Sequence, residues 1–167
     1  MTVVISLRVV AEELDALMEG FDAYLNRETG EVSVISVDDI RLLDGVDDLG
    51  EFDLPAWHIE NLAHALEVLE SHEWVRLPSA FDIHEWPILE DFSMSQDDSA
   101  LRDELLGAIR GPGAFRLFKD IIHRRGIRDH WHEFKLMALE QLAAGCLESH
   151  GISYSRGDSS PSAPAPN

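Results

Sequence analysis

The stretch FDAYLNRETGEVSVI, residues 21–35, carries the clearest structural signal in the chain. Apolar and polar residues alternate over residues 21–25 and again over residues 31–35, as they do in strands with one buried face. The loop between them, residues 26–30, ends in Gly30, and glycine readily takes the positive φ that hairpin turns require. The stretch therefore predicts an antiparallel β-hairpin.

A short apolar stretch at residues 73–78 predicts a third strand, which Pro78 ends. Apolar residues at three- and four-residue intervals predict helices on both sides of these strands. The predicted helices cover residues 9–20, 55–71, 100–110, 114–123 and 131–150. The acidic residues 38–53 predict a loop with a short helical piece. We expect an α+β fold, in which a small antiparallel sheet (the hairpin near 21–35 plus the strand near 73–78) packs against four to five helices.

A chain of 167 residues is long enough for one compact domain with a substantial core. We expect a single α+β domain over residues 1–154 and a disordered tail over residues 155–167, where SRGDSSPSAPAPN has no large apolar side chain to bury. In the helix over residues 55–71, the pattern predicts five inward residues, Trp57, Leu62, Ala65, Leu66 and Leu69. In the C-terminal helices it predicts a shared core of Phe115, Phe118, Ile121, Trp131, Phe134 and Leu142.

The chain is strongly acidic, since 32 Asp and Glu against 13 Lys and Arg give a formal net charge of −19. Most carboxylates fall within residues 1–110, whereas residues 111–135 are basic. Five cations of this basic segment form a candidate basic surface, Arg116, Lys119, Arg124, Arg125 and Arg128. The overall field repels nucleic acid and anionic membranes and attracts basic proteins or divalent cations.

The basic segment has three interpretations. Arg116, Lys119 and Arg124 form intramolecular ion pairs with the acidic part of the chain, which is the use we favour. Alternatively, Gly113, Arg116 and Lys119 form an anion-binding corner at a helix start. The third interpretation is a nucleic-acid surface, but the interleaved aromatic residues recur at the spacing of a helix core and not of exposed stacking platforms.

Cys146 is the single cysteine, which excludes an internal disulfide and any multi-cysteine metal centre. It lies on the apolar side of the last predicted helix, a position typical of a buried and unreactive thiol. The N-terminal residues lack the basic region and the small-residue cleavage site of a secretory signal, and no apolar run is long enough to span a bilayer. We expect a cytoplasmic protein without a membrane segment.

Three groups of residues together resemble one family. The first is the hairpin motif AYLNRETGEV, residues 23–32, and the second joins RLP at 76–78 to HEW at 84–86 and LEDF at 89–92. The third comprises GAFRLFKD at 113–120, WHEFK at 131–135, Ala143 and the Gly-Ile pair at 151–152. With these motifs the chain resembles the bacterial UPF0158 family of uncharacterised proteins over most of residues 20–152. The resemblance implies a shared fold and brings no activity, cofactor or catalytic residue with it.

Metal chemistry requires several ligands on one face of an element. The chain has three His-Glu dipeptides, but none is followed by the second histidine of the zinc motif His-Glu-x-x-His. Glu60, His64 and Glu67 share one helix face at four- and three-residue spacing and form the candidate metal set. His130 and His132, near the start of the last helix, are a second candidate histidine set.

The pattern assigns no catalytic residue and no cofactor. Negative charge without a catalytic constellation favours a non-enzymatic interaction or regulatory module, whose acidic part binds a basic protein partner. The alternative is a metal-dependent hydrolase or other enzyme with a His/carboxylate site. Nucleic-acid binding through residues 111–135 ranks third, because the acidic field opposes it.

Overall fold

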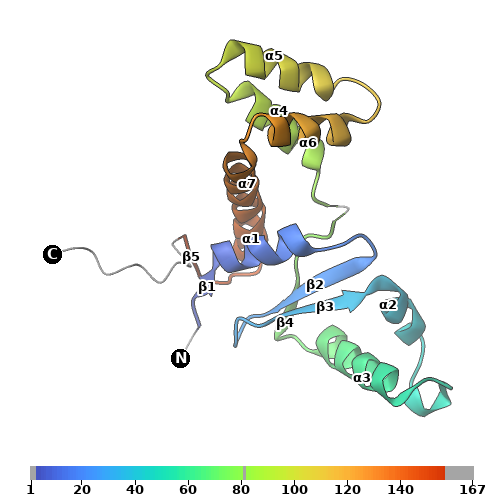
Figure 1. The fold of residues 1–167 in the computed structure, drawn as a ribbon. Helices are drawn as coiled ribbons and strands as arrows, with labels where there is room; N and C mark the ends of the chain where they lie inside the picture. Colours follow the sequence, from blue (N-terminus) through green and yellow to red (C-terminus); the bar gives the residue numbers. More distant parts are fainter. Residues whose placement is uncertain (1–2, 81, 157–167) are drawn as a thin grey trace. The chain divides into compact units, whose positions relative to one another are not determined.

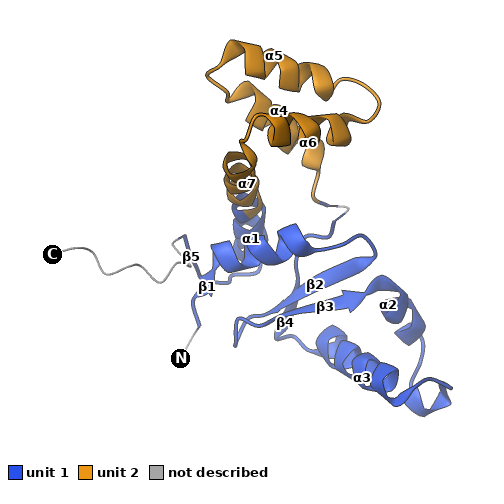
Figure 2. Ribbon diagram, viewed as in Figure 1, with its two compact units in different colours: residues 1–82, 140–167 blue, residues 83–139 orange. Residues whose placement is uncertain are grey.

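The computed structural model describes residues 3–80 and 82–156. The chain divides into two compact units (Figure 2). Unit 1 comprises residues 1–82 and 140–167, and unit 2 comprises residues 83–139. The region over which the sequence predicts one domain therefore contains two compact units. The secondary structure agrees with the predicted α+β class, since the described residues form helices together with a three-stranded antiparallel sheet and a two-stranded parallel sheet (Figure 1).

Unit 1 is built on a three-stranded antiparallel sheet with the strand order β3-β2-β4. The strands are β2 (Phe21–Asn26), β3 (Val32–Ser36) and β4 (Trp74–Arg76). Tyr24 of β2 pairs with Ser33 on one side and with Arg76 on the other. The predicted hairpin and the predicted third strand are therefore confirmed, and β2 is the central strand.

The hairpin turn is stabilised by Asn26, which is buried. Its Oδ1 accepts hydrogen bonds from the backbone N–H groups of Glu28 (2.8 Å) and Thr29 (3.1 Å). Gly30 closes the turn at φ +78°, a conformation that other L-residues rarely adopt. A Cβ at this position would also lie 3.3 Å from Ile5 Cδ1. The turn therefore requires this glycine both for its backbone and for the close approach of Ile5.

One face of the sheet packs against α3 (Ala56–Glu70). Tyr24 and Ile35 share a buried cluster with Leu62, Ala65 and Val68 of this helix. Between β3 and α3 the chain forms α2 (Val37–Leu43) and the short 3-10 helix η1 (Leu49–Glu51). The short helical piece predicted within residues 38–53 therefore exists, and α2 and η1 both contact α3.

Alternate strand residues point to opposite sides of a sheet, so Ala23 and Leu25 lie on the other face. Both are fully buried. On this side Figure 1 shows α1 (Leu7–Ala16). An ion pair of 3.1 Å between Arg8 Nε and Glu140 Oε1 links α1 to the second half of α7 (Arg128–Ser149). Helix α1 begins and ends earlier than the predicted 9–20, since Ser6 caps it and Leu17 already has extended backbone.

A second, parallel sheet pairs β1 (Ile5–Ser6) with β5 (Tyr154–Ser155). Sequence patterns did not predict it, because two residues are too few to show an alternation. Ser155 pairs with Ser6, so the predicted start of the tail falls inside a strand. The rest of that predicted tail, residues 157–167, lies outside the described residues.

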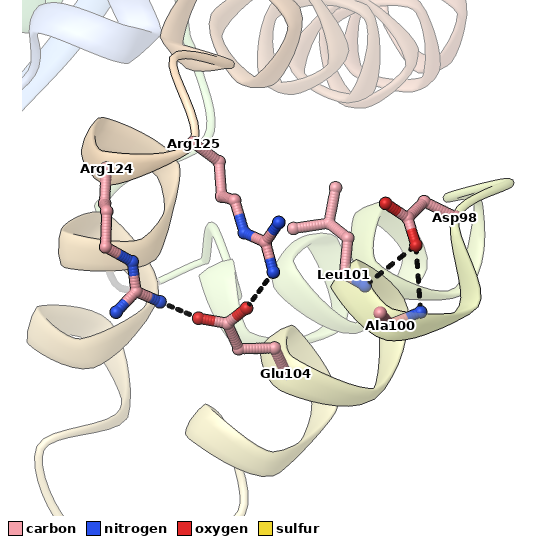
Figure 3. Close-up of polar contacts among 6 residues, drawn as sticks. All are labelled: Asp98, Ala100, Leu101, Glu104, Arg124 and Arg125. Carbon is pink, nitrogen blue, oxygen red and sulfur yellow. Dashed lines mark hydrogen bonds and ion pairs between the residues drawn. The ribbon is translucent and has the colours of Figure 1, made fainter.

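Unit 2 is helical and contains α4 (Glu85–Met94), α5 (Ser99–Ala108), α6 (Ala114–Arg124) and the first half of α7. Phe92 lies at the centre of its core, with ring centroids 5.9 Å from Phe118, 5.2 Å from Trp131 and 5.3 Å from Phe134. All three pairs are edge-to-face, the favourable arrangement for aromatic rings. Helix α5 is capped by Asp98, the residue directly before it (Figure 3).

Several of the core predictions need correction. Phe118 and Ile121 are buried, and Trp131 and Phe134 pack partly buried against the same cluster. Phe115 is 43% exposed and Leu142 is 39% exposed, so neither belongs to the predicted core. In α3, Leu62 and Ala65 are buried and Leu66 is half-buried, as predicted. Leu69, in the last turn, is exposed, and so is Trp57 in the first turn.

None of the helices within residues 3–80 and 82–156 combines the length and the apolar composition needed to cross a bilayer.

Candidate functional site

The most unusual exposed side chain of unit 1 is Trp57, with 63% of its surface accessible. Tryptophan is highly buried in most proteins, because its large indole gains much from leaving water. Trp57 is exposed because it occupies the first turn of α3 and lies five residues before Leu62. Five residues turn a helix by about 140° beyond one full circle, which directs Trp57 away from the buried stripe.

The indole of Trp57 rests on the imidazole of His58. The two ring centroids are 5.1 Å apart with an interplanar angle of 10°, a stacked arrangement. His58 is held in turn by Asp39 of α2, whose Oδ1 accepts a hydrogen bond of 2.8 Å from His58 Nε2. Both partners are largely shielded from solvent. The indole is therefore supported by an ordered pair, while 63% of the surface of Trp57 stays accessible.

Carboxylates surround this tryptophan in the sequence and in the helices that contact α3. Residues 37–60 contain eight acidic residues and one basic residue, Arg41. Seven of the eight are exposed, namely Asp38, Asp44, Asp47, Asp48, Glu51, Asp53 and Glu60. Within the described residues, Arg41 bonds to Asp38 at 3.5 Å and no other cation pairs with these seven. We call Trp57, the His58–Asp39 pair and these seven carboxylates the Trp57 surface.

The candidate metal set does not form a ligand cluster. Glu60, His64 and Glu67 all lie exposed on α3. His64 is engaged elsewhere, with its Nε2 2.8 Å from Ser33 Oγ and its ring edge-on to Trp74. Over the part of the chain that the structure describes, no three His, Cys, Asp or Glu side chains converge closely enough to hold a metal ion.

The two histidines of the second candidate set, His130 and His132, also make different contacts. His130 packs its ring against Phe92, with centroids 5.3 Å apart. His132 lines a cleft between α6 and α7 together with residues of the basic segment. The two side chains therefore have different surroundings, as their two-residue spacing on a helix requires.

The five cations of the candidate basic surface divide into two groups. Arg124 and Arg125 both form ion pairs with Glu104 of α5, the latter at 2.6 Å (Figure 3). The predicted pairing with the acidic part of the chain is therefore confirmed for Arg124. Arg116, Lys119 and Arg128 have no carboxylate partner within residues 3–80 and 82–156, so the pairing predicted for Arg116 and Lys119 is wrong.

Cys146 lines a smaller cleft of unit 1 together with Arg76, Asp82 and His150. Burial raises the pKa of its thiol above the ordinary value. The Sγ–H group donates to the carbonyl oxygen of Arg76 at 3.5 Å, and His150 Nδ1 lies 2.9 Å from the Cys146 carbonyl oxygen. A protonated thiol is a poor nucleophile, so these residues do not form an activated Cys-His pair.

A scan against protein-family models, a search of curated proteins and a search of solved structures each find no match for this chain. Membership of the UPF0158 family therefore stays a prediction that rests on the motifs.

The Trp57 surface was missed because the pattern assigned Trp57 to the core of its helix. Two sequence signals could have found it. The spacing of five between Trp57 and Leu62 does not match a helical repeat. The tryptophan also directly follows a run in which nearly every charge is negative.

Proposed function

We propose that this protein is a non-enzymatic interaction module that binds a basic segment of a partner protein on the Trp57 surface. The observation that carries the proposal is the exposure of Trp57, 63%, within the most acidic part of unit 1. Tryptophan is enriched among the few residues that supply most of the binding energy at protein interfaces.

The chemistry of this surface favours arginine in the partner. A guanidinium group stacks on an indole face and donates paired hydrogen bonds to a carboxylate. Trp57 offers accessible indole surface, because it stays largely exposed although it stacks on His58. The exposed carboxylates of α2, η1 and the start of α3 have the matching charge. An arginine-rich segment would therefore find both kinds of contact among residues 37–60.

The acidic field adds a second contribution, which acts on the rate of association. A surface with one sign of charge draws an oppositely charged partner at low salt, and salt screens this attraction. The aromatic contact is less sensitive to salt. Binding should therefore weaken with salt but should retain a component that depends on Trp57.

We also infer a cytoplasmic setting, which the single cysteine favours.

The proposal is tested by fluorescence anisotropy with a short labelled arginine-rich peptide, added to wild type, Trp57→Ala and Trp86→Ala. Both substitutions leave the net charge unchanged, and Trp86, in unit 2, is also exposed. We expect Trp57→Ala to weaken binding about tenfold, as loss of an interface hot spot does, and Trp86→Ala to bind like wild type.

A second pair of variants tests whether peptide binding depends on where the carboxylates lie or only on how many there are. Glu51→Gln with Asp53→Asn removes two carboxylates close to Trp57 in sequence, and Glu12→Gln with Glu13→Gln removes two from α1 on the opposite side of the sheet. The first pair should weaken peptide binding more than the second. Equal affinities for wild type and Trp57→Ala, or equal losses in the two double variants, would show that only net charge attracts the peptide and would refute the proposal.

A further inference from the structure

Unit 2 contains a cleft of about 710 Å³ between α6 and the start of α7. This volume falls within the range of about 300–1,000 Å³ that is usual for small-molecule sites. Every residue that lines it belongs to residues 119–132, so the cleft is local to one helix pair of unit 2. It is separate from the Trp57 surface, which lies in unit 1.

The cleft is lined by two permanent cations, two imidazoles and two carboxylates, together with two apolar side chains. Lys119 and His123 are four residues apart on α6 and therefore share a face, as do Arg128 and His132 on α7. All four side chains line the cleft. Each helix thus contributes one permanent cation and one imidazole.

The remaining lining residues are two apolar side chains and two carboxylates. Ile122 is buried in the core, and the half-buried Trp131 packs on Phe118 with ring centroids 4.8 Å apart, so these two form an apolar wall. Asp120 and Asp129 each follow one of the permanent cations by one residue and line the same cleft. An anion in the cleft therefore has to bind to Lys119 and Arg128 with two carboxylates nearby.

Lys119 and Arg128 differ from the other cations of the basic segment in their pairing. Within the described residues, neither Lys119 nor Arg128 has an ion-pair or hydrogen-bond partner, whereas Arg124 and Arg125 of the same segment share Glu104. Unpaired cations that converge in a concave site favour an anion that brings several acceptor oxygens.

From this geometry we propose that the α6–α7 cleft binds a small organic phosphate. Lys119 and Arg128 bind the phosphate oxygens, His123 and His132 add donors, and Trp131 with Ile122 contacts the organic part. A concave site of this size suits a small molecule better than a duplex, whose many phosphates would also meet the acidic remainder of the chain.

The test is isothermal titration calorimetry of the full chain with AMP and with inorganic phosphate, at constant ionic strength. The key variant is Lys119→Gln with Arg128→Gln. The matched control is Arg124→Gln with Arg125→Gln, which removes the same charge from the same segment but outside the cleft. Far-UV circular dichroism verifies that both variants keep their helices.

We expect saturable binding of AMP to wild type and to the control, with inorganic phosphate binding more weakly because it lacks the organic part. Each lost cation should weaken binding by about tenfold or more, as loss of a charged hydrogen bond does.

Three results would overturn the proposal. The first is no saturable binding of either phosphate to wild type. The second is an equal loss of affinity in the Lys119/Arg128 and Arg124/Arg125 variants, which would indicate general charge attraction. The third is tight binding of a labelled DNA duplex through the same two cations, which would make the site a nucleic-acid contact.

Discussion

Phe118 is the residue that best tests the packing of unit 2. It is fully buried, and its ring contacts Phe92 and Trp131 edge-to-face. Replacing a buried phenylalanine by alanine removes apolar burial and leaves a cavity. We expect Phe118→Ala to lower the free energy of unfolding by about 3–5 kcal/mol, measured by urea denaturation.

Phe115, on the same helix, is the matched control because 43% of its surface is exposed. Phe115→Ala should cost well under half as much as Phe118→Ala. If the two variants unfold at the same urea concentration, the burial assigned to α6 is wrong.

Cys146 gives a second prediction at this scale. Burial raises the pKa of its thiol, so the fold favours the neutral form; this contribution is present at neutral pH and is lost as the pH rises through the raised pKa. Alkylation by iodoacetamide requires the thiolate. At about pH 8 the folded protein should react more slowly than the urea-unfolded chain, and its rate should rise at a higher pH. A folded protein that reacts as fast as the unfolded chain would contradict this account.

Individual residues also show where sequence patterns succeed and fail. The pattern correctly predicts that Leu62, Ala65 and Phe118 are buried. Each lies in the middle of its helix, where other elements pack along the whole apolar side. Trp57 and Phe115 were assigned wrongly, since both lie in the first turn of their helices. At a first turn, the neighbouring helices and strands that would cover the side chain can end before they reach it. Helical periodicity carries no information about where those neighbours end.

At the scale of elements, the N-terminus of α5 offers a sharp comparison. The Oδ1 of Asp98 accepts hydrogen bonds from the N–H groups of Ala100 (2.9 Å) and Leu101 (3.3 Å) (Figure 3). We expect Asp98→Ala to lower the free energy of unfolding by about 1 kcal/mol, because two helix N–H groups lose their acceptor. A thermal or urea melt measures this loss.

Asp97→Ala removes the same charge one residue earlier, where no capping bond forms within the described residues. It should leave the stability almost unchanged. A larger loss from Asp97→Ala or from Ser99→Ala than from Asp98→Ala would show that the cap lies elsewhere.

The two remaining differences between pattern and structure also belong to elements. Helix α7 buries Leu136 and Leu139 in unit 2 and Ala143 and Leu147 in unit 1, as one stripe along the helix. Trp131 and Phe134 pack only partly buried in unit 2, and Leu142 continues their line along the helix. Leu142 is exposed, since a helix turns by about 140° between it and Leu147. The sequence pattern followed the line of Trp131 and Phe134 and therefore placed Leu142 in the core. The β1–β5 pair was missed for another reason: its two strands are separated by most of the chain.

At the scale of the whole molecule, charge predicts how the protein meets nucleic acid. Two of the five cations of the basic surface pair with Glu104, and within the described part of the chain the other three, Arg116, Lys119 and Arg128, have no carboxylate partner. Three phosphate contacts would give a salt slope near −3 on duplex DNA, and the net charge of −19 opposes association. We expect no binding of a labelled oligonucleotide at physiological salt. Submicromolar anisotropy binding that is lost in Lys119→Glu would contradict this prediction.

The central claim is that Trp57, and not the acidic charge as a whole, defines where a basic partner binds. Two-dimensional amide NMR of the labelled protein, titrated with an arginine-rich peptide, tests this directly. The account predicts that the largest shifts occur at the indole N–H of Trp57 and at amides of α2, η1 and the first turns of α3, with small shifts on α1 near Glu12 and Glu13. Shifts spread evenly over acidic residues of both units, with the Trp57 indole unmoved, would contradict it.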